Sequence, residues 1–217
     1  NGRGACFAEA QSLANSEFLV IADLDAGQRE ARIFAAVPLT SDELDRHFGE
    51  AIQDVLRVYW DEREQAVLAR RQRHLGELIL SDAAARNPDP AQLALAMLEG
   101  VRSMGLDALP WTAVLRQWQA RVLFSRTAQP DATPAWPDVS DAALLTTLDD
   151  WLLPWLDGVA RRTHLARLDL RAALHGLLNW QQQQQLDAFA PTHLEVPSGS
   201  RLAIDYLHAN EWAVSGG

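Results

Sequence analysis

The sequence predicts an α+β fold, with a small β-barrel first, an α-helical domain next and a β-hairpin at the end. Short apolar runs with strand character fill the first third of the 217 residues. Helical periodicity replaces them after the chain breaker Asn87–Pro90, and strand character returns after Pro191. We therefore expect domains over residues 1–87 and 88–190, and a further β unit over 191–217.

The first domain is predicted from runs rich in Phe, Val and Ile. They lie at Ala5–Ala8, Phe18–Leu24 and Ala31–Val37. The stretch Asp25–Gln28 supplies a hairpin connection whose Gly27 is free to adopt positive φ. Since both faces of Phe18–Leu24 are apolar, we expect a covered sheet or a barrel.

A helix is predicted after these strands. Thr40 and Glu43 have the spacing of a capping box, and Leu39 and Leu44 that of a hydrophobic staple. Apolar residues then follow at helical spacing, which predicts a helix as far as Leu56. These residues are Leu44, Phe48, Ile52, Val55 and Leu56.

Further strands are expected at Val58–Trp60, Gln65–Arg71 and Leu75–Leu80. Three strands, a helix and then two further strands are the order of an OB-fold, a barrel that often binds single-stranded nucleic acid. We therefore predict an OB-like barrel with one inserted helix, although other small α+β domains share this order.

The middle domain is predicted to be a set of helices. Two apolar stripes follow the breaker, and a third helix begins at Ser140 and ends before Pro154. Thr163, Asp169 and Asn179 are expected to cap three shorter helices, with Gln181–Gln185 on a solvated face. The stripes consist of Leu93, Met97, Val101 and Met104, then of Trp111, Val114, Leu115, Trp118 and Val122.

Composition excludes some chemistry. The chain has no Lys, so it supplies neither the lysine of a phosphate-binding P-loop nor a Schiff-base amine. The net charge of −10 opposes nucleic-acid binding by bulk electrostatics, so any such contact requires a local patch. The single Cys6 fits a reducing compartment such as the cytoplasm, and no apolar run is long enough to span a membrane. Asn1–Ala5 lacks an initiator Met and a signal peptide, as expected of a cut through a longer protein.

Three stretches resemble a known family. Asn1–Ala5 is similar to its NGRGA segment, and Tyr59–Asp61 with Ala69–Gly76 is similar to its WD and ARRQRRLG stretch. Ala190–Arg201, which reads APTHLEVPSGSR, matches the family almost letter for letter. The chain thus resembles the C-terminal accessory region of the HrpB family of bacterial DEAH-box ATP-dependent helicases. The family continues into a strand similar to PVLAVRLQELFG, whereas His208–Gly217 departs from it, so we expect a truncated, tagged or divergent last β unit.

The resemblance implies a helicase whose motor domains lie upstream in the parent chain. ATP and Mg²⁺ are then expected for those domains and no cofactor for this region, which lacks the P-loop and DEAH segments. The expected partners are single-stranded RNA or DNA and the motor domains in cis, without a membrane. The expected role is to guide the single strand or to regulate the motor.

A basic cluster is the first candidate site. Arg70, Arg71, Arg73 and His74 lie at the end of a predicted strand, and guanidinium groups bind phosphate in a bidentate manner. Because a strand alternates its faces, at most two or three of these side chains point the same way. The alternative is a solvated edge, or ion pairs with the acidic residues at 61, 62 and 64.

The turn from Pro197 to Arg201 is the second candidate. Ser198, Ser200 and Arg201 offer two hydroxyl groups and a guanidinium beside backbone N–H groups, a set that suits a phosphate. The same residues favour a tight hairpin turn, which is the interpretation we prefer.

Tryptophans are the third candidate, because indole rings stack on bases. Trp111, Trp118 and Trp151 fall on helical apolar stripes and are expected in a core. Trp60, beside Tyr59, is retained as a stacking residue. No His pair has metal-ligand spacing, and no catalytic residue is predicted.

Two function classes remain open. The β-rich part favours a nucleic-acid-guiding module of a helicase. The acidic balance and the helical part favour a protein-interaction or scaffold domain that docks a partner or the motor domains without touching nucleic acid.

Overall fold

The computed structural model describes residues 4–25, 31–197 and 199–208, which form two compact units. The first unit comprises Asn1–Arg57 and Arg70–Ala85. The second comprises Val58–Ala69 and Arg86–Gly217, so the tip of one β-hairpin belongs with the helices. The predicted Asp25–Gln28 turn lies largely outside the described residues.

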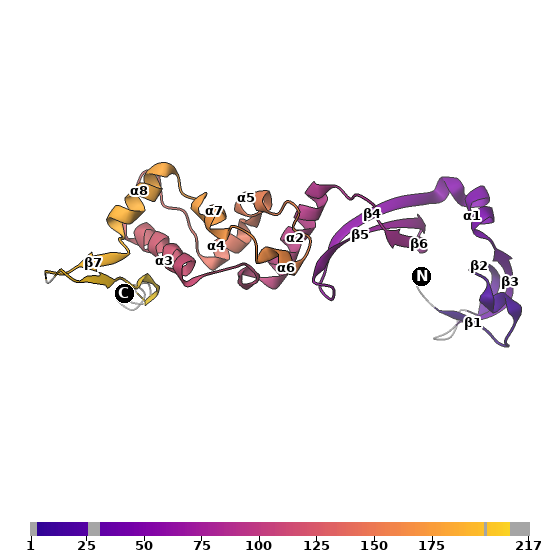
Figure 1. The fold of residues 1–217 in the computed structure, drawn as a ribbon. Coiled ribbons are helices and arrows are strands. Elements are labelled where there is room, and N and C mark those ends of the chain that lie inside the picture. Colours follow the sequence, from indigo (N-terminus) through magenta and orange to yellow (C-terminus); the bar gives the residue numbers. More distant parts are fainter. Residues whose placement is uncertain (1–3, 26–30, 198, 209–217) are drawn as a thin grey trace. The chain divides into compact units, whose positions relative to one another are not determined.

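The fold is α+β, as the sequence predicts (Figure 1). The strands are β1 Ala5–Phe7, β2 Phe18–Asp25, β3 Ala31–Leu39, β4 Ile52–Asp61, β5 Ala66–Leu75, β6 Leu78–Ala84, β7 His193–Glu195 and β8 Arg201–Ala203. The α-helices are α1 Ser41–Phe48, α2 Pro90–Met104, α3 Ala113–Ala128, α4 Asp141–Thr146, α5 Leu148–Trp151, α6 Arg162–Leu165, α7 Leu170–His175 and α8 Trp180–Phe189. Short 3-10 turns are η1 Ser12–Asn15, η2 Gly49–Ala51, η3 Leu106–Ala108 and η4 Leu153–Trp155.

The first unit is built on a sheet with the strand order β1-β3-β2. β1 runs parallel to β3, and β2 pairs with β3 antiparallel, with irregular register near Asp23. Ala31 and Ile33 of β3 are buried, as is Leu44 of α1. The covered sheet predicted from both apolar faces is not found, because Val20, Phe34 and Val37 are 47%, 63% and 61% exposed.

The capping box at the start of α1 is confirmed. Thr40 Oγ1 accepts a hydrogen bond from the Glu43 backbone N–H at 3.3 Å, and the Glu43 carboxylate accepts from the Thr40 N–H at 2.9 Å. The predicted extension of this helix to Leu56 is wrong, because β4 begins at Ile52. The stretch is short and rich in β-branched residues, and such apolar runs fit either period.

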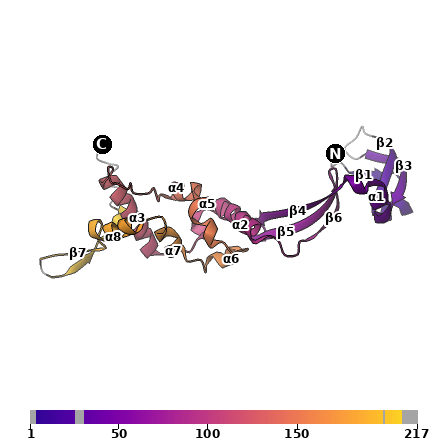
Figure 2. The ribbon, with the colours of Figure 1, turned by 90° about the horizontal axis from the view of Figure 1, so that it is seen from above.

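The predicted OB-like barrel is not confirmed. The described strands make three separate sheets, with the orders β1-β3-β2, β4-β5-β6 and β7-β8. Figure 2 shows β4, β5 and β6 side by side. Three strands follow α1 before α2 begins, one more than the five-stranded OB-fold requires, and the order of elements along the chain does not determine which strands pair.

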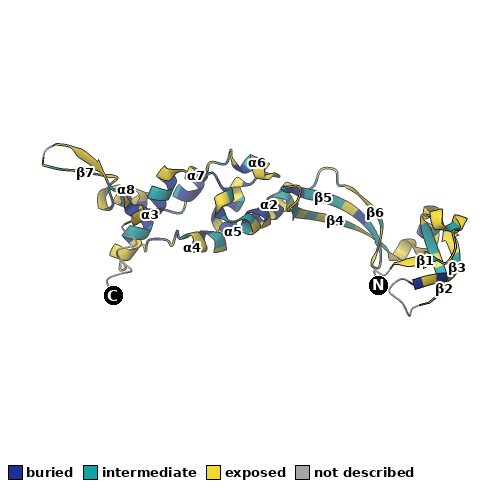
Figure 3. Cartoon of the chain, turned by 90° about the horizontal axis from the view of Figure 1, so that it is seen from below, coloured by how far each residue is buried: buried dark blue, intermediate teal, exposed yellow. Residues whose placement is uncertain are grey.

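The second unit has one continuous apolar core. α2 contributes Met97, Leu98 and Val101, and α3 contributes Trp118 and Val122. Their buried faces appear dark blue in Figure 3. The predicted stripes therefore face the core, except that Val114 is 75% exposed. Core positions were also predicted for Trp118 and Trp151, which are buried; Trp111 is half-buried and donates its Nε1–H to the Leu106 carbonyl at 3.0 Å.

Side chains cap most of these helices as predicted. Ser140, Asp169 and Asn179 accept backbone N–H groups at the starts of α4, α7 and α8. Thr163 does not cap a helix, because α6 begins at Arg162 and contains it. The single helix predicted after Ser140 is divided at Thr147 into α4 and α5.

The glutamine run in α8 is not wholly solvated. Gln182 is only 4% exposed, since its amide donates to the Ala135 carbonyl at 2.9 Å and also completes the α8 capping box with Asn179. After α8, β7 and β8 form the predicted terminal hairpin, in which Leu194 lies opposite Leu202. Within the described residues, no helix is both long enough and apolar enough to cross a membrane.

Candidate nucleic-acid interface

The predicted basic cluster lies on β5, between β4 and β6. Alternation along the strand places Arg71 and Arg73 on one face and Arg70 and His74 on the other. Arg70 lies opposite Ala84 of β6, and His74 lies just past a register shift. The strand therefore divides the cluster between two faces of the sheet, as expected from the sequence.

Each arginine of the cluster already has an acidic partner. Arg70 Nε lies 2.9 Å from Asp82 Oδ1, and Arg71 Nε lies 3.7 Å from Asp54 Oδ1. The hydrogen bond from Arg70 also helps to hold the pKa of Asp82 below its usual value. These positive charges are therefore compensated within the first unit.

Arg73 is paired as well. Its Nη2 donates to the carboxylate of Asp45 in α1, and this bond raises the Arg73 pKa. The acids expected as partners act elsewhere: Asp61 accepts the backbone N–H of Arg63, and Glu62 accepts the Ser103 hydroxyl. His74 Nε2 lies 3.0 Å from Gln72 Oε1.

The Trp60 ring is covered by α2 on one side. A Cβ atom built on Gly100 would lie 2.5 Å from Trp60 Cδ2, so the indole lies directly against the α2 backbone. Its Nε1 is buried and has no hydrogen-bond partner among the described residues. The ring thus anchors the hairpin tip to the second unit.

The turn between β7 and β8 uses its own backbone groups. Gly199 has a φ of +82° and donates its N–H to the Val196 carbonyl at 2.8 Å, while the Val196 N–H donates to the Ser200 carbonyl at 3.0 Å. Ser198 lies outside the described residues, and Arg201 is exposed opposite Glu195. These contacts are those of a tight hairpin turn.

Sequence reasoning overlooked a second set of arginines. Arg161, Arg162, Arg167 and Arg171, called here the basic segment, are all exposed around α6 and α7. None of them forms an ion pair with a described carboxylate. The signal was present in the sequence, because Asp169 is the only acid between the first and last of these arginines. Its carboxylate accepts the Ala172 N–H at 2.9 Å and caps α7.

The hairpin tip and α6 are joined directly. The Val67 N–H donates to the Ala160 carbonyl at 2.8 Å, and the Arg162 N–H donates to the Gln65 carbonyl at 3.0 Å. The Arg162 guanidinium also donates to Gln65 Oε1 at 2.9 Å. The start of the basic segment is thus fixed against the loop that joins β4 and β5.

The residues present do not fit an ATP–Mg²⁺ site. The sequence contains no Lys to reach nucleotide phosphates. Across the described ranges, no three His, Cys, Asp or Glu side chains gather as metal ligands would. No catalytic step is therefore assigned to these residues.

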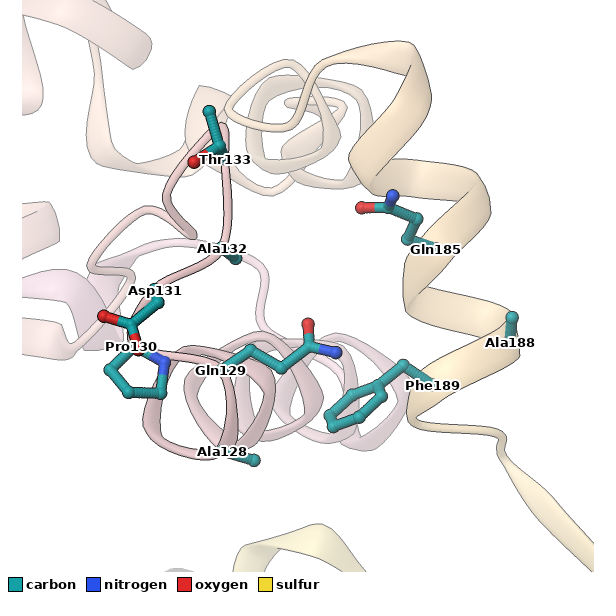
Figure 4. Close-up of a pocket in the computed structure, with 9 residues that line it drawn as sticks. All are labelled: Ala128, Gln129, Pro130, Asp131, Ala132, Thr133, Gln185, Ala188 and Phe189. Carbon is teal, nitrogen blue, oxygen red and sulfur yellow. The ribbon is translucent and has the colours of Figure 1, made fainter.

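A cavity of about 630 Å³ lies between the end of α3 and α8. The side chains of Gln129 and Phe189 point toward one another there (Figure 4), and Gln129 Oε1 accepts the Trp136 Nε1–H at 3.0 Å. Of the described residues that line it, only Asp131 is charged. A phosphate would find no cation there.

Two family models match the chain. Residues 151–215 match the ATP-dependent helicase C-terminal model named HrpB_C, and residues 51–84 match the connector region of the ATP-dependent RNA helicase HrpB. The connector match covers β4, β5 and β6, and the C-terminal match includes the basic segment.

Relatives support the same assignment. The ATP-dependent RNA helicase HrpB of Escherichia coli (strain K12) is 36% identical over 217 residues, which are 99% of this chain and 27% of that protein. A crystal structure of the E. coli DExH-box NTPase HrpB matches with a TM-score of 0.54 and 36% identity, over 93% of this chain and 25% of that one. A crystal structure of the Escherichia coli DEAH/RHA helicase HrpB gives a TM-score of 0.53 and 34% identity, over 94% and 25%.

These matches define the class as the C-terminal region of an ATP-dependent helicase. The chain belongs to the HrpB family and corresponds to that region of its members. It spans about a quarter of the length of the relatives that it matches.

Proposed function

We propose that this chain is an accessory, non-motor region of an ATP-dependent helicase, which guides single-stranded RNA or DNA or regulates the motor. The observation that carries the proposal is the match of nearly the whole chain to about a quarter of a helicase. In the parent, ATP and Mg²⁺ would serve motor domains outside this region, and the protein would work in the cytoplasm.

The basic segment is the better supported phosphate contact. Arg161, Arg162 and Arg167 are exposed and have no acidic partner among the described residues. Binding there releases counterions without first breaking an ion pair. The β5 arginines with His74, the Trp60 ring and the Ser198–Arg201 turn remain secondary contacts in this proposal. At β5 a phosphate would have to displace an aspartate.

A salt titration tests this proposal. Affinity for short single-stranded RNA and DNA is measured over a series of salt concentrations, and log K is plotted against log salt. Each phosphate neutralised on a single strand contributes a slope of about −0.7. Changing Arg161, Arg162 and Arg167 together to Ala should flatten the slope by roughly two units.

The matched control changes Arg70, Arg71 and Arg73 to Ala, which removes the same charge. Because these arginines are ion-paired, this variant should flatten the slope by less than the first one does. Greater flattening in the control would place the strand on β5. No binding by the unchanged chain at low salt would refute the nucleic-acid function.

We also propose a second function, the docking of a protein partner or of the motor domains. Its support is the acidic balance of the chain, with a net charge of −10, and the exposed apolar pair on the terminal hairpin. Leu194 and Leu202 lie opposite one another and are each 56% exposed. Apolar side chains in such a position favour a protein contact over a phosphate backbone.

A further inference from the structure

The second unit contains a groove that lies outside both the proposed phosphate contacts and the exposed Leu194–Leu202 pair. It has a volume of about 730 Å³ and lies among α3, α7, α8 and the base of the β7–β8 hairpin. Leu115, Trp118, Leu186 and Ile204 contribute its apolar lining, and Val114 of α3 lies at it with 75% of its surface exposed. The size is typical of a ligand pocket.

The acids of this groove are already engaged. Asp187 Oδ1 lies 2.6 Å from Arg121 Nη2, and this arginine also donates to the Ala190 carbonyl at 2.6 Å. Asp205 accepts the amide of Gln117 at 2.6 Å. The charge of Asp187 is therefore offset by Arg121, whereas Asp205 is held in place by a neutral amide.

Of the two described arginines that line the groove, Arg121 is paired and Arg171 is not. Arg171 is exposed and forms no ion pair with a described carboxylate. His175 lies one turn further along α7, on the same face. Burial lowers the pKa of His175, and Arg171 lowers it further. The groove thus combines an apolar lining with one exposed guanidinium, that of Arg171, which pairs with no described carboxylate.

The lining favours a peptide over a nucleobase. The Trp118 ring is only 5% exposed and is stacked on His175, with a centroid distance of 5.0 Å and an interplanar angle of 17°. Its face is therefore not free for the base stacking by which single strands are bound. Aliphatic side chains such as Leu115 and Val114 instead suit an apolar anchor.

We propose that this groove binds a protein segment in which an apolar side chain lies next to a carboxylate. The apolar side chain packs on Val114, Leu115 and Ile204, and the carboxylate pairs with the Arg171 guanidinium. The inference rests on the docking function proposed above and gives it a site and a ligand chemistry. The Leu194–Leu202 pair is not part of this site, because alternation places it on the opposite face of the hairpin from His193 and Ala203, which line the groove.

The test uses the whole chain and two pools of acetylated, amidated hexapeptides. In one pool Leu and Ile alternate with Asp and Glu, and in the other with Lys and Arg. Binding is followed by NMR through the Trp118 indole N–H and the Ile204 backbone N–H, both of which belong to groove residues. We expect saturable shifts of both signals with the acidic pool only.

Two charge reversals separate the groove from general electrostatics. Arg171→Glu should weaken binding of the acidic pool by about tenfold, because it replaces attraction by repulsion. Arg86→Glu makes the same change at an exposed arginine of the same unit that does not line the groove, and should leave affinity within about twofold. Val114→Ser removes an exposed apolar contact without a change of charge, and should weaken binding by about threefold.

Several results would overturn the inference. These are equal losses in the two reversals, stronger binding of the basic pool, saturable shifts away from the groove, or no binding of either pool. A pull-down with separately produced motor domains of the parent distinguishes failure of the groove proposal from failure of the docking function. If the Arg171→Glu variant binds the motor domains as well as the unchanged chain does, the docking function is supported but the groove is not its site. If the unchanged chain does not bind the motor domains, docking to the motor domains is refuted.

Discussion

Gly100 lies in the middle of α2, where glycine is normally unfavourable, because the ring of Trp60 occupies the space of a side chain. The close approach lets an indole from the β4 strand pack on the helix backbone. Ser103 of α2 also donates its hydroxyl to Glu62, in the turn that follows β4, at 3.0 Å. A single residue without a side chain thus fixes the hairpin tip to the helices of the second unit.

Gly100→Ala should lower the free energy of unfolding of the second unit by about 1–3 kcal/mol, the usual cost of overpacking. The added Cβ would meet Trp60 Cδ2 at 2.5 Å and Cε3 at 2.6 Å, so the indole must shift. Urea unfolding followed by circular dichroism measures the change. Gly49→Ala is the control, because nothing lies within 4 Å of its added Cβ and its φ of −53° suits alanine. Equal stability of the two variants would contradict the proposed packing.

At the scale of elements, α8 depends on a side chain from another helix. Arg121 of α3 is only 8% exposed and donates to the carbonyls of Leu186 and Ala190, where α8 ends. The Leu186 carbonyl also accepts the Ala190 N–H at 2.9 Å, but the Ala190 carbonyl follows the helix and has no partner within it, so a buried end needs a donor of this kind. A cation there also opposes the partial negative charge of the helix terminus.

Arg121→Met should therefore destabilise the chain by about 2–3 kcal/mol, because it leaves buried carbonyls without a charged donor. Arg126→Met is the matched control on the same helix. Its ion pair with Asp138 spans 3.4 Å between half-exposed side chains, and its loss should cost less than about 1 kcal/mol. Thermal unfolding of both variants provides the comparison, and a small effect at Arg121 would show that solvent satisfies these carbonyls.

For the whole molecule, charge is distributed unevenly between two compact units. In the first unit the β5 arginines are each paired with an aspartate. In the second, the basic segment is unpaired among the described residues. The chain thus has a net charge of −10 but carries one stretch of exposed arginines without described acidic partners, and any contact with phosphate should depend on them.

The isolated chain should show no ATP hydrolysis, with or without RNA, since no residue can take the place of the P-loop lysine. Phosphate release is measured across the fractions of a sizing column, with an active ATPase run in parallel as the assay control. Turnover that follows the protein peak would refute the assignment of this chain as a motor-free region.

The sequence by itself determined the local features. The capping residues Thr40, Ser140, Asp169 and Asn179 act as their spacing predicted, because a cap depends on neighbours within one helical turn. The β7–β8 hairpin also forms where the sequence predicted it, because its turn depends on adjacent residues. The family, too, could be assigned from short stretches such as Ala190–Arg201.

Tertiary structure decided what depends on distant residues. The stretch after Phe48 fitted a helix by periodicity, yet Ile52 begins a strand that pairs within a sheet. The partners of Arg70 and Arg73 come from β6 and α1, and their positions follow from strand pairing rather than from sequence proximity. Trp60 packs on Gly100, forty residues further along the chain, and no spacing in the sequence indicates that contact. Periodicity reports which face of an element is apolar, but only packing determines what covers that face and which charges remain unpaired.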